Sequence, residues 1–237
     1  MTIKQFLFTT KQFNLNNKNY IIFLFTTILL MVYNFFIVAK LTEFFQLKSL
    51  SVKTSNNYYD DFTFVVIFIF IGLLGPIYEE IVYRYFLNQK SQLFYSGFFL
   101  LIVNIVSQAH SYLTRSLDVI VNFGIPIALG SLVYILLSKF KEIPVPKNFR
   151  IFAVVISILL FSIGHSAKYD LSVSPKLTML TIFVVLLQFI PTSLFFTFLR
   201  FKFKEGFKAA VLAHCMYNSI VVILLYISMR YLRYLLL

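Results

Sequence analysis

Residues 62–87 read FTFVVIFIFIGLLGPIYEEIVYRYFL, a run that is long and apolar enough to cross a membrane. About 20 apolar residues in a helix span the ~30 Å hydrocarbon core of a bilayer. Three ionisable residues nevertheless stand in the run, namely Glu79, Glu80 and Arg84. Such a group at the centre of a spanning helix costs about 2.5 to 3.5 kcal/mol, so it normally forms a pair or takes part in function. This stretch therefore predicts a membrane helix that carries a functional site.

The rest of the chain continues the apolar pattern. Of its 237 residues, 59% are hydrophobic and 13% are charged, and the mean hydropathy is +0.84, which excludes an ordinary soluble domain. We predict an all-α fold, a polytopic transmembrane helix bundle of about seven spans that forms one membrane domain over residues 20–237. The predicted spans are residues 20–39, 62–87, 93–112, 119–138, 151–167, 177–199 and 209–229.

The charges between these spans indicate membrane lipids as partners and no nucleic acid. The net charge of +12 comes from Lys and Arg residues that stand singly between apolar runs, where they would lie beside anionic headgroups. Residues 1–19 are predicted to form either a disordered polar leader or a stretch that lies on the membrane surface. Basic residues are more frequent in the loops on the side of the N-terminus, which predicts a cytoplasmic N-terminus.

Helical geometry separates the two neighbouring glutamates. Glu80 and Arg84 are four residues apart, in the acid-before-base order that favours an ion pair on one helix face. Glu79 is turned about 100° away, so Arg84 is not its natural partner. Gly75 and Pro76 weaken the helix just before the acids, as expected where a backbone bends or admits water. A purely structural pair needs one acid only, so we predict another role for Glu79.

Two histidines stand in polar motifs inside apolar segments. His214 and Asn218 share one helix face, where an imidazole and a carboxamide can hold an oxygen-bearing group between them. His165 follows Phe161 by one helical turn. For one histidine alone, a hydrogen-bonded core residue is the more frequent explanation. A carboxylate, two imidazoles and a carboxamide together, however, are what is needed to activate a water and stabilise an oxyanion.

These motifs resemble, in the same order, those of the CAAX-protease and bacteriocin-processing family of intramembrane endopeptidases, also called the CPBP or Abi family. The resemblance covers about residues 65–225, and the matching motifs are Glu79-Glu80-x-x-x-Arg84, Phe161-x-x-x-His165 and His214-x-x-x-Asn218.

The resemblance implies roles for these residues. Glu79 would be the general base that, with His165, activates the attacking water, and His214 with Asn218 would hold the oxyanion. The supporting residues would be those that orient the motif helix and pack beside it, namely Glu80, Arg84 and Phe161.

A metal is a further implication of the resemblance. The family is classed with metalloproteases by its motifs, and a glutamate-dependent mechanism without metal is the competing interpretation. Zn²⁺ would take Glu79, His165 and His214 as its protein ligands and keep one open position. The sequence contains no HExxH spacing, so it does not establish a metal.

The second motif has an alternative assignment. Residues 106–110 end in His110 and stand nearer to the first motif, but they lack the phenylalanine. The longer separation between Glu80 and His165 holds two extra crossings, an even number, so the directions of the motif helices are preserved. We therefore favour His165.

The leading functional interpretation is an endopeptidase that hydrolyses a peptide bond in a small hydrophobic or membrane-associated peptide or protein. The alternative is a non-catalytic membrane immunity or scaffold protein with the same fold. A small proton-coupled transporter is a third possibility, but no inverted repeat supports it. The abundance of Lys, Asn, Ile, Phe and Tyr suggests an AT-rich genome, which favours a bacterial source and hence a bacterial cytoplasmic membrane. A bacterial source in turn argues against a prenylated substrate.

Overall fold

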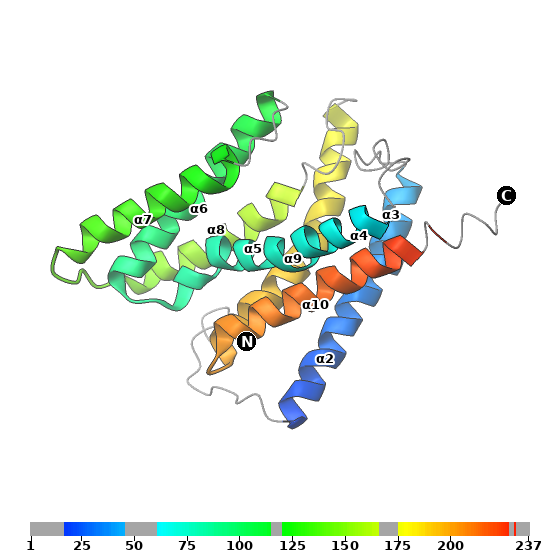
Figure 1. Ribbon diagram of the computed structural model, residues 1–237, viewed down its shortest axis with the longest axis horizontal. Coiled ribbons are helices and arrows are strands. Elements are labelled where there is room, and N and C mark those ends of the chain that lie inside the picture. Colours follow the sequence, from blue (N-terminus) through cyan, green and yellow to red (C-terminus); the bar gives the residue numbers. More distant parts are fainter. Residues whose placement is uncertain (1–16, 46–60, 115–119, 166–174, 228–229, 231–237) are drawn as a thin grey trace.

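The chain folds into a bundle of helices, as a computed structural model shows for residues 17–45, 61–114, 120–165, 175–227 and 230 (Figure 1). Two long helices change to π-helical geometry along their length. One consists of α2 (Asn17–Val32), η1 (Tyr33–Val38) and α3 (Ala39–Phe44), and the other of α4 (Asp61–Ile67), η3 (Phe68–Leu74) and α5 (Gly75–Tyr83). The following elements are η4 (Tyr85–Asn88), α6 (Ser91–Thr114), η5 (Ile120–Gly124), α7 (Ile125–Ser138), α8 (Lys147–Gly164), α9 (Pro175–Lys202) and α10 (Gly206–Ile227).

The all-α membrane bundle predicted from the sequence is confirmed. Six helices of the described chain are long and apolar enough to cross a membrane, and they correspond to the last six predicted spans. They are Thr63–Tyr83, Ser91–His110, Val121–Ser138, Lys147–Gly164, Lys176–Lys202 and Gly206–Ile227. The first predicted span, residues 20–39, lies within the continuous helix of α2, η1 and α3. Of the predicted leader, residues 1–16 lie outside the described residues and residues 17–19 begin α2.

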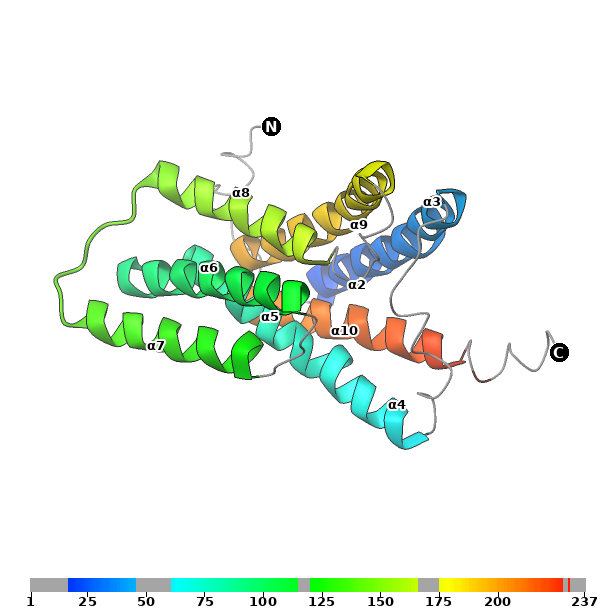
Figure 2. The same ribbon diagram turned by 90° about the horizontal axis from the view of Figure 1, so that it is seen from above.

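The helix that carries the two glutamates lies at the centre of the bundle. Figures 1 and 2 show α5 between α6 and α7 at one end of the molecule and α2 and α3 at the other. One buried cluster joins α5 to α6, α8 and α9 through residues that include Tyr83, Phe161 and Phe189. A second cluster joins α2, α9 and α10 through residues that include Phe23, Phe196 and Tyr217. The motif helix is therefore packed by residues that lie far apart in the sequence.

The π-helical segment η3 sits directly before the motif helix. The N–H of Gly75 donates to the carbonyl of Phe70, five residues earlier, and Pro76 follows in the first turn of α5. A Cβ atom on Gly72 would come within 3.0 Å of the Ser219 hydroxyl on α10. The weakened helix predicted from Gly75 and Pro76 is thus a widened helix that packs closely against α10.

Candidate active site

Glu80 and Arg84 form the predicted ion pair, and both side chains are fully buried. Arg84 Nη1 lies 2.5 Å from Glu80 Oε1, and Nη2 donates to the Ser193 hydroxyl at 2.8 Å. The guanidinium lies over the Phe161 ring at 4.3 Å and near the Phe196 ring at 5.3 Å. Aromatic faces stabilise a cation in such a position, so side chains of α8 and α9 hold this charge pair.

Glu79 faces away from this pair and remains partly exposed, at 29% of its side chain. Its Oε2 atom lies 3.5 Å from His214 Nε2 and 3.9 Å from His165 Nε2. Oε2 itself is buried and has no hydrogen-bond partner among the residues that the structure describes. The carboxylate predicted to lack a partner therefore faces both motif histidines. Its distance of 3.9 Å to His165 is too long for a direct hydrogen bond.

The other ring nitrogen of each histidine is fixed by a hydrogen bond. His165 Nδ1 lies 2.7 Å from the carbonyl oxygen of Phe161, which can only accept, so Nδ1 carries the hydrogen. His214 Nδ1 lies 2.9 Å from Glu80 Oε1 and donates to this carboxylate in the same way. In the neutral imidazoles the lone pair is then on Nε2, which is the atom that each ring presents to Glu79.

Aromatic rings hold both imidazoles in place. His165 stacks on Phe189 at a centroid distance of 4.0 Å, and His214 stacks on Phe196 at 4.5 Å. Phe161 contacts both imidazoles, at 4.6 Å for His165 and 6.0 Å for His214. Both histidines are therefore oriented by α9, in addition to the helices that carry them.

The end of the motif helix is fixed by a buried arginine of α9. Arg200 donates from Nε to the carbonyl of Arg84 at 3.3 Å and from Nη2 to the carbonyl of Tyr85 at 2.9 Å. Near the start of the helix, Tyr78 donates to Asn104 on α6 at 2.6 Å. Residues on both sides of the two glutamates are thus tied to neighbouring helices.

Two candidate residues lie elsewhere. Asn218, predicted to contact the oxyanion, donates its amide to the carbonyl of Ile71 in η3 at 3.1 Å. His110, the alternative histidine of the second motif, lies exposed near the end of α6, whereas His165 is the one that faces Glu79. The structure therefore brings together Glu79, His165 and His214 and directs Asn218 toward the π-helical segment.

The same three residues were predicted as ligands of a metal. One carboxylate and two imidazole nitrogens are ligands that Zn²⁺ accepts. Within the described ranges, however, no group of three or more His, Cys, Asp or Glu side chains is arranged to hold a metal ion. The arrangement of these three side chains does not fit the predicted zinc site.

Several residues of the site were not identified from the sequence. Ser193, Phe189 and Phe196 all come from α9, an apolar helix that carries none of the three sequence motifs. The only sequence signal for them is the polar pair Thr192 and Ser193 beside a proline inside a predicted span. Phenylalanine is so frequent in this chain that no single ring could be selected.

The comparisons with known proteins give one match. A family model described as type II CAAX prenyl endopeptidase Rce1-like matches residues 61–220, more than half of the chain. The matched range includes the motif residues Glu79, Glu80, Arg84, Phe161, His165, His214 and Asn218. No curated protein and no solved structure matches the chain.

Proposed function

Because the chain belongs to the Rce1-like type II CAAX prenyl endopeptidase family, we propose that it hydrolyses a peptide bond in a small hydrophobic or membrane-associated peptide or protein. Membership confirms the family resemblance found in the motifs, and it supports endopeptidase activity in the membrane. The observation that carries the proposal is the carboxylate of Glu79, which faces the Nε2 atoms of His165 and His214.

Glu79 and His165 are suited to activate a water molecule. A water held between Glu79 Oε2 and His165 Nε2 donates one hydrogen to each, which leaves an oxygen lone pair free for attack. Attack on the carbonyl carbon of the scissile bond forms the new C–O bond, and the water proton passes to Glu79. The C=O electron pair moves to the oxygen and produces the oxyanion of a tetrahedral intermediate.

His214 is placed to stabilise that oxyanion. In its doubly protonated form it donates from Nδ1 to Glu80 and from Nε2 to the oxyanion. When the intermediate collapses, the C–N bond breaks and Glu79 returns its proton to the leaving amine. The Glu80–Arg84 pair contributes no proton to these steps and orients the imidazole of His214.

The first prediction concerns Glu79→Gln, which keeps the shape of the side chain and removes its basicity. We expect cleavage to fall about 10²- to 10⁴-fold, the usual contribution of a general base. The measurement uses the full chain in lipid vesicles with a set of membrane-anchored peptides, with and without a prenyl group, and detects products by mass spectrometry.

Glu205→Gln is the matched control, since this exposed acid pairs with Lys208 at the surface, and its replacement should leave cleavage unchanged. Equal cleavage by the wild type and Glu79→Gln would exclude the proposed base. Peptides that bind the wild type and remain intact would favour the non-catalytic immunity or scaffold alternative.

A further inference from the structure

Pro191 stands inside α9, between the two residues whose rings stack on the histidines of the site, Phe189 and Phe196. Proline has no N–H, so the carbonyl of Leu187, four residues earlier, loses its usual helical donor. An unpaired carbonyl within a membrane costs several kcal/mol, so another group normally satisfies it.

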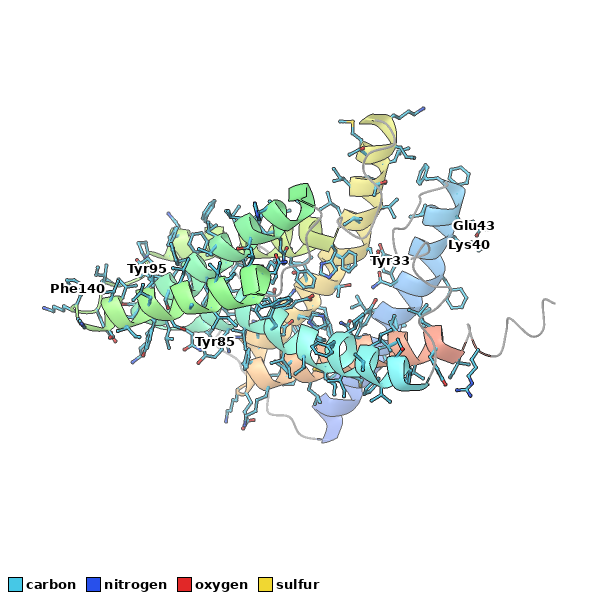
Figure 3. The ribbon with its side chains drawn as sticks, turned by 45° about the horizontal axis from the view of Figure 1, so that its top comes forward. Tyr33, Lys40, Glu43, Tyr85, Tyr95 and Phe140 are labelled. Atoms are coloured by element: carbon cyan, nitrogen blue, oxygen red, sulfur yellow. The ribbon has the colours of Figure 1, made fainter. Side chains whose placement is uncertain are left out.

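That group comes from the helix of α2, η1 and α3, outside the residues that the family model matches. The hydroxyl of Tyr33 donates to the carbonyl of Leu187 at 3.0 Å, and Figure 3 shows Tyr33 between its own helix and α9. The next residue, Asn34, is buried and donates its amide to the Thr192 hydroxyl at 3.3 Å and to the Tyr217 hydroxyl at 2.6 Å. Two consecutive residues of η1 therefore join α9 and α10 beside the proline.

The same helix also packs against the residues around the site. Phe23 of α2 belongs to the buried cluster that contains Phe196 and Tyr217. Phe196 in turn stacks on His214 at 4.5 Å. The π-helical geometry of η1 is confined to Tyr33–Val38, the segment that begins with the two hydrogen-bonding residues, and such segments occur frequently at functional sites.

We propose that Tyr33 and Asn34 are positioning residues for the active site. Tyr33 replaces the hydrogen bond that Pro191 removes from α9, and Asn34 joins Thr192 of α9 to Tyr217 of α10. Together they fix the rings of Phe189 and Phe196 against His165 and His214. The activity part of this inference rests on the proposed function, whereas the ring geometry does not.

The second prediction compares Tyr33→Phe and Asn34→Leu with Thr27→Val. Thr27 is the matched control because it is buried on the same helix. Within the described residues its hydroxyl bonds only to the carbonyl of Phe23 in that helix. With a peptide that the wild type cleaves, we expect Tyr33→Phe and Asn34→Leu to lower kcat about tenfold to hundredfold, as small displacements of reacting groups do. KM should stay unchanged because both side chains bond to α9 and α10 and not to Glu79, His165 or His214, and Thr27→Val should leave both constants unchanged.

Pro191→Ala tests the link to the proline. Alanine restores the N–H donor for Leu187, so Tyr33→Phe should have no further effect on kcat in the Pro191→Ala background. An equal effect of Tyr33→Phe in both backgrounds would overturn the proposed replacement of the missing hydrogen bond.

An optical readout works without any substrate. The chain contains no tryptophan, so Phe189→Trp introduces a single indole beside His165, and the emission of an indole depends on the groups that contact it. In this background Tyr33→Phe and Asn34→Leu should change the emission intensity, and Thr27→Val should not. If the wild type cleaves no peptide, a changed emission still supports the positioning role while the proposed function fails. If kcat and emission both match those of Thr27→Val, and only the folded amount falls, the positioning role is wrong.

Discussion

At the scale of single residues, the site depends on the different surroundings of two neighbouring glutamates. Glu80 is fully buried and bonded to both Arg84 and His214. Glu79 is partly exposed, and its buried oxygen has no hydrogen-bond partner in the described part of the chain. A carboxylate whose charge is already compensated is a poor base, and one that faces two imidazoles and retains access to water is a suitable one. The helical offset of about 100° between consecutive residues produces this difference.

The third prediction follows from the burial of Arg84. Glu80→Ala leaves the guanidinium of Arg84 without a counter-charge in the interior. This should lower the free energy of unfolding by about 3 to 5 kcal/mol and reduce the amount of folded protein. Thermal unfolding in detergent measures this loss, and a normal Tm would contradict the structural role of the pair.

The double variant Glu80→Leu with Arg84→Met separates stability from activity. Replacing both charges by apolar side chains of similar size is often neutral for stability, so the folded amount should recover. Cleavage should remain low because His214 has lost the carboxylate that accepts from Nδ1. Recovery of both properties would show that Glu80 has no part in orienting His214.

At the scale of elements, η3 and α10 are joined by side chains that donate to backbone carbonyls. Asn218 donates to Ile71 and Ser219 donates to Gly72 at 3.3 Å, while the thiol of Cys215 lies 3.6 Å from the carbonyl of Leu73. Carbonyls of a distorted helix within a membrane need such donors. These contacts fix the segment that leads into Glu79. They also occupy the carboxamide of Asn218, which was predicted to bind the oxyanion.

The fourth prediction distinguishes these two roles of Asn218. Asn218→Ala and Ser219→Ala each remove one donor to η3, so a purely structural role makes their effects equal. If Asn218 releases Ile71 during the reaction and donates to the oxyanion, its variant alone should lower kcat about 10²- to 10³-fold with little change in KM. Steady-state kinetics on both variants decides between the structural role and the oxyanion role. Similar kcat and KM values for the two variants would show that Asn218 does not bind the oxyanion.

At the scale of the whole molecule, the sequence predicted the helical class and the last six spans because apolar length alone specifies them. It also selected Glu79 and His165, which lie far apart in the chain and face each other in the bundle. The contributions of α9 and of the helix formed by α2, η1 and α3 could not be predicted. Ser193, Tyr33 and Asn34 act through contacts between helices, and neither helical period nor motif spacing specifies which helices become neighbours.

The last prediction concerns the orientation of the molecule in the membrane, for which we propose a bacterial cytoplasmic membrane with a cytoplasmic N-terminus. Lys141 lies before α8 and Lys176 at the start of α9, so one crossing separates these two exposed residues. In a chain with Cys215→Ser, we expect a membrane-impermeant thiol reagent to label Lys141→Cys from the cytoplasmic side alone and Lys176→Cys from the opposite side alone. The excess of basic loops on the side of Lys141 is the physical reason, because cytoplasmic loops retain positive charge. The reverse labelling would invert the orientation, and labelling of both positions from one side would mean that α8 does not cross the membrane.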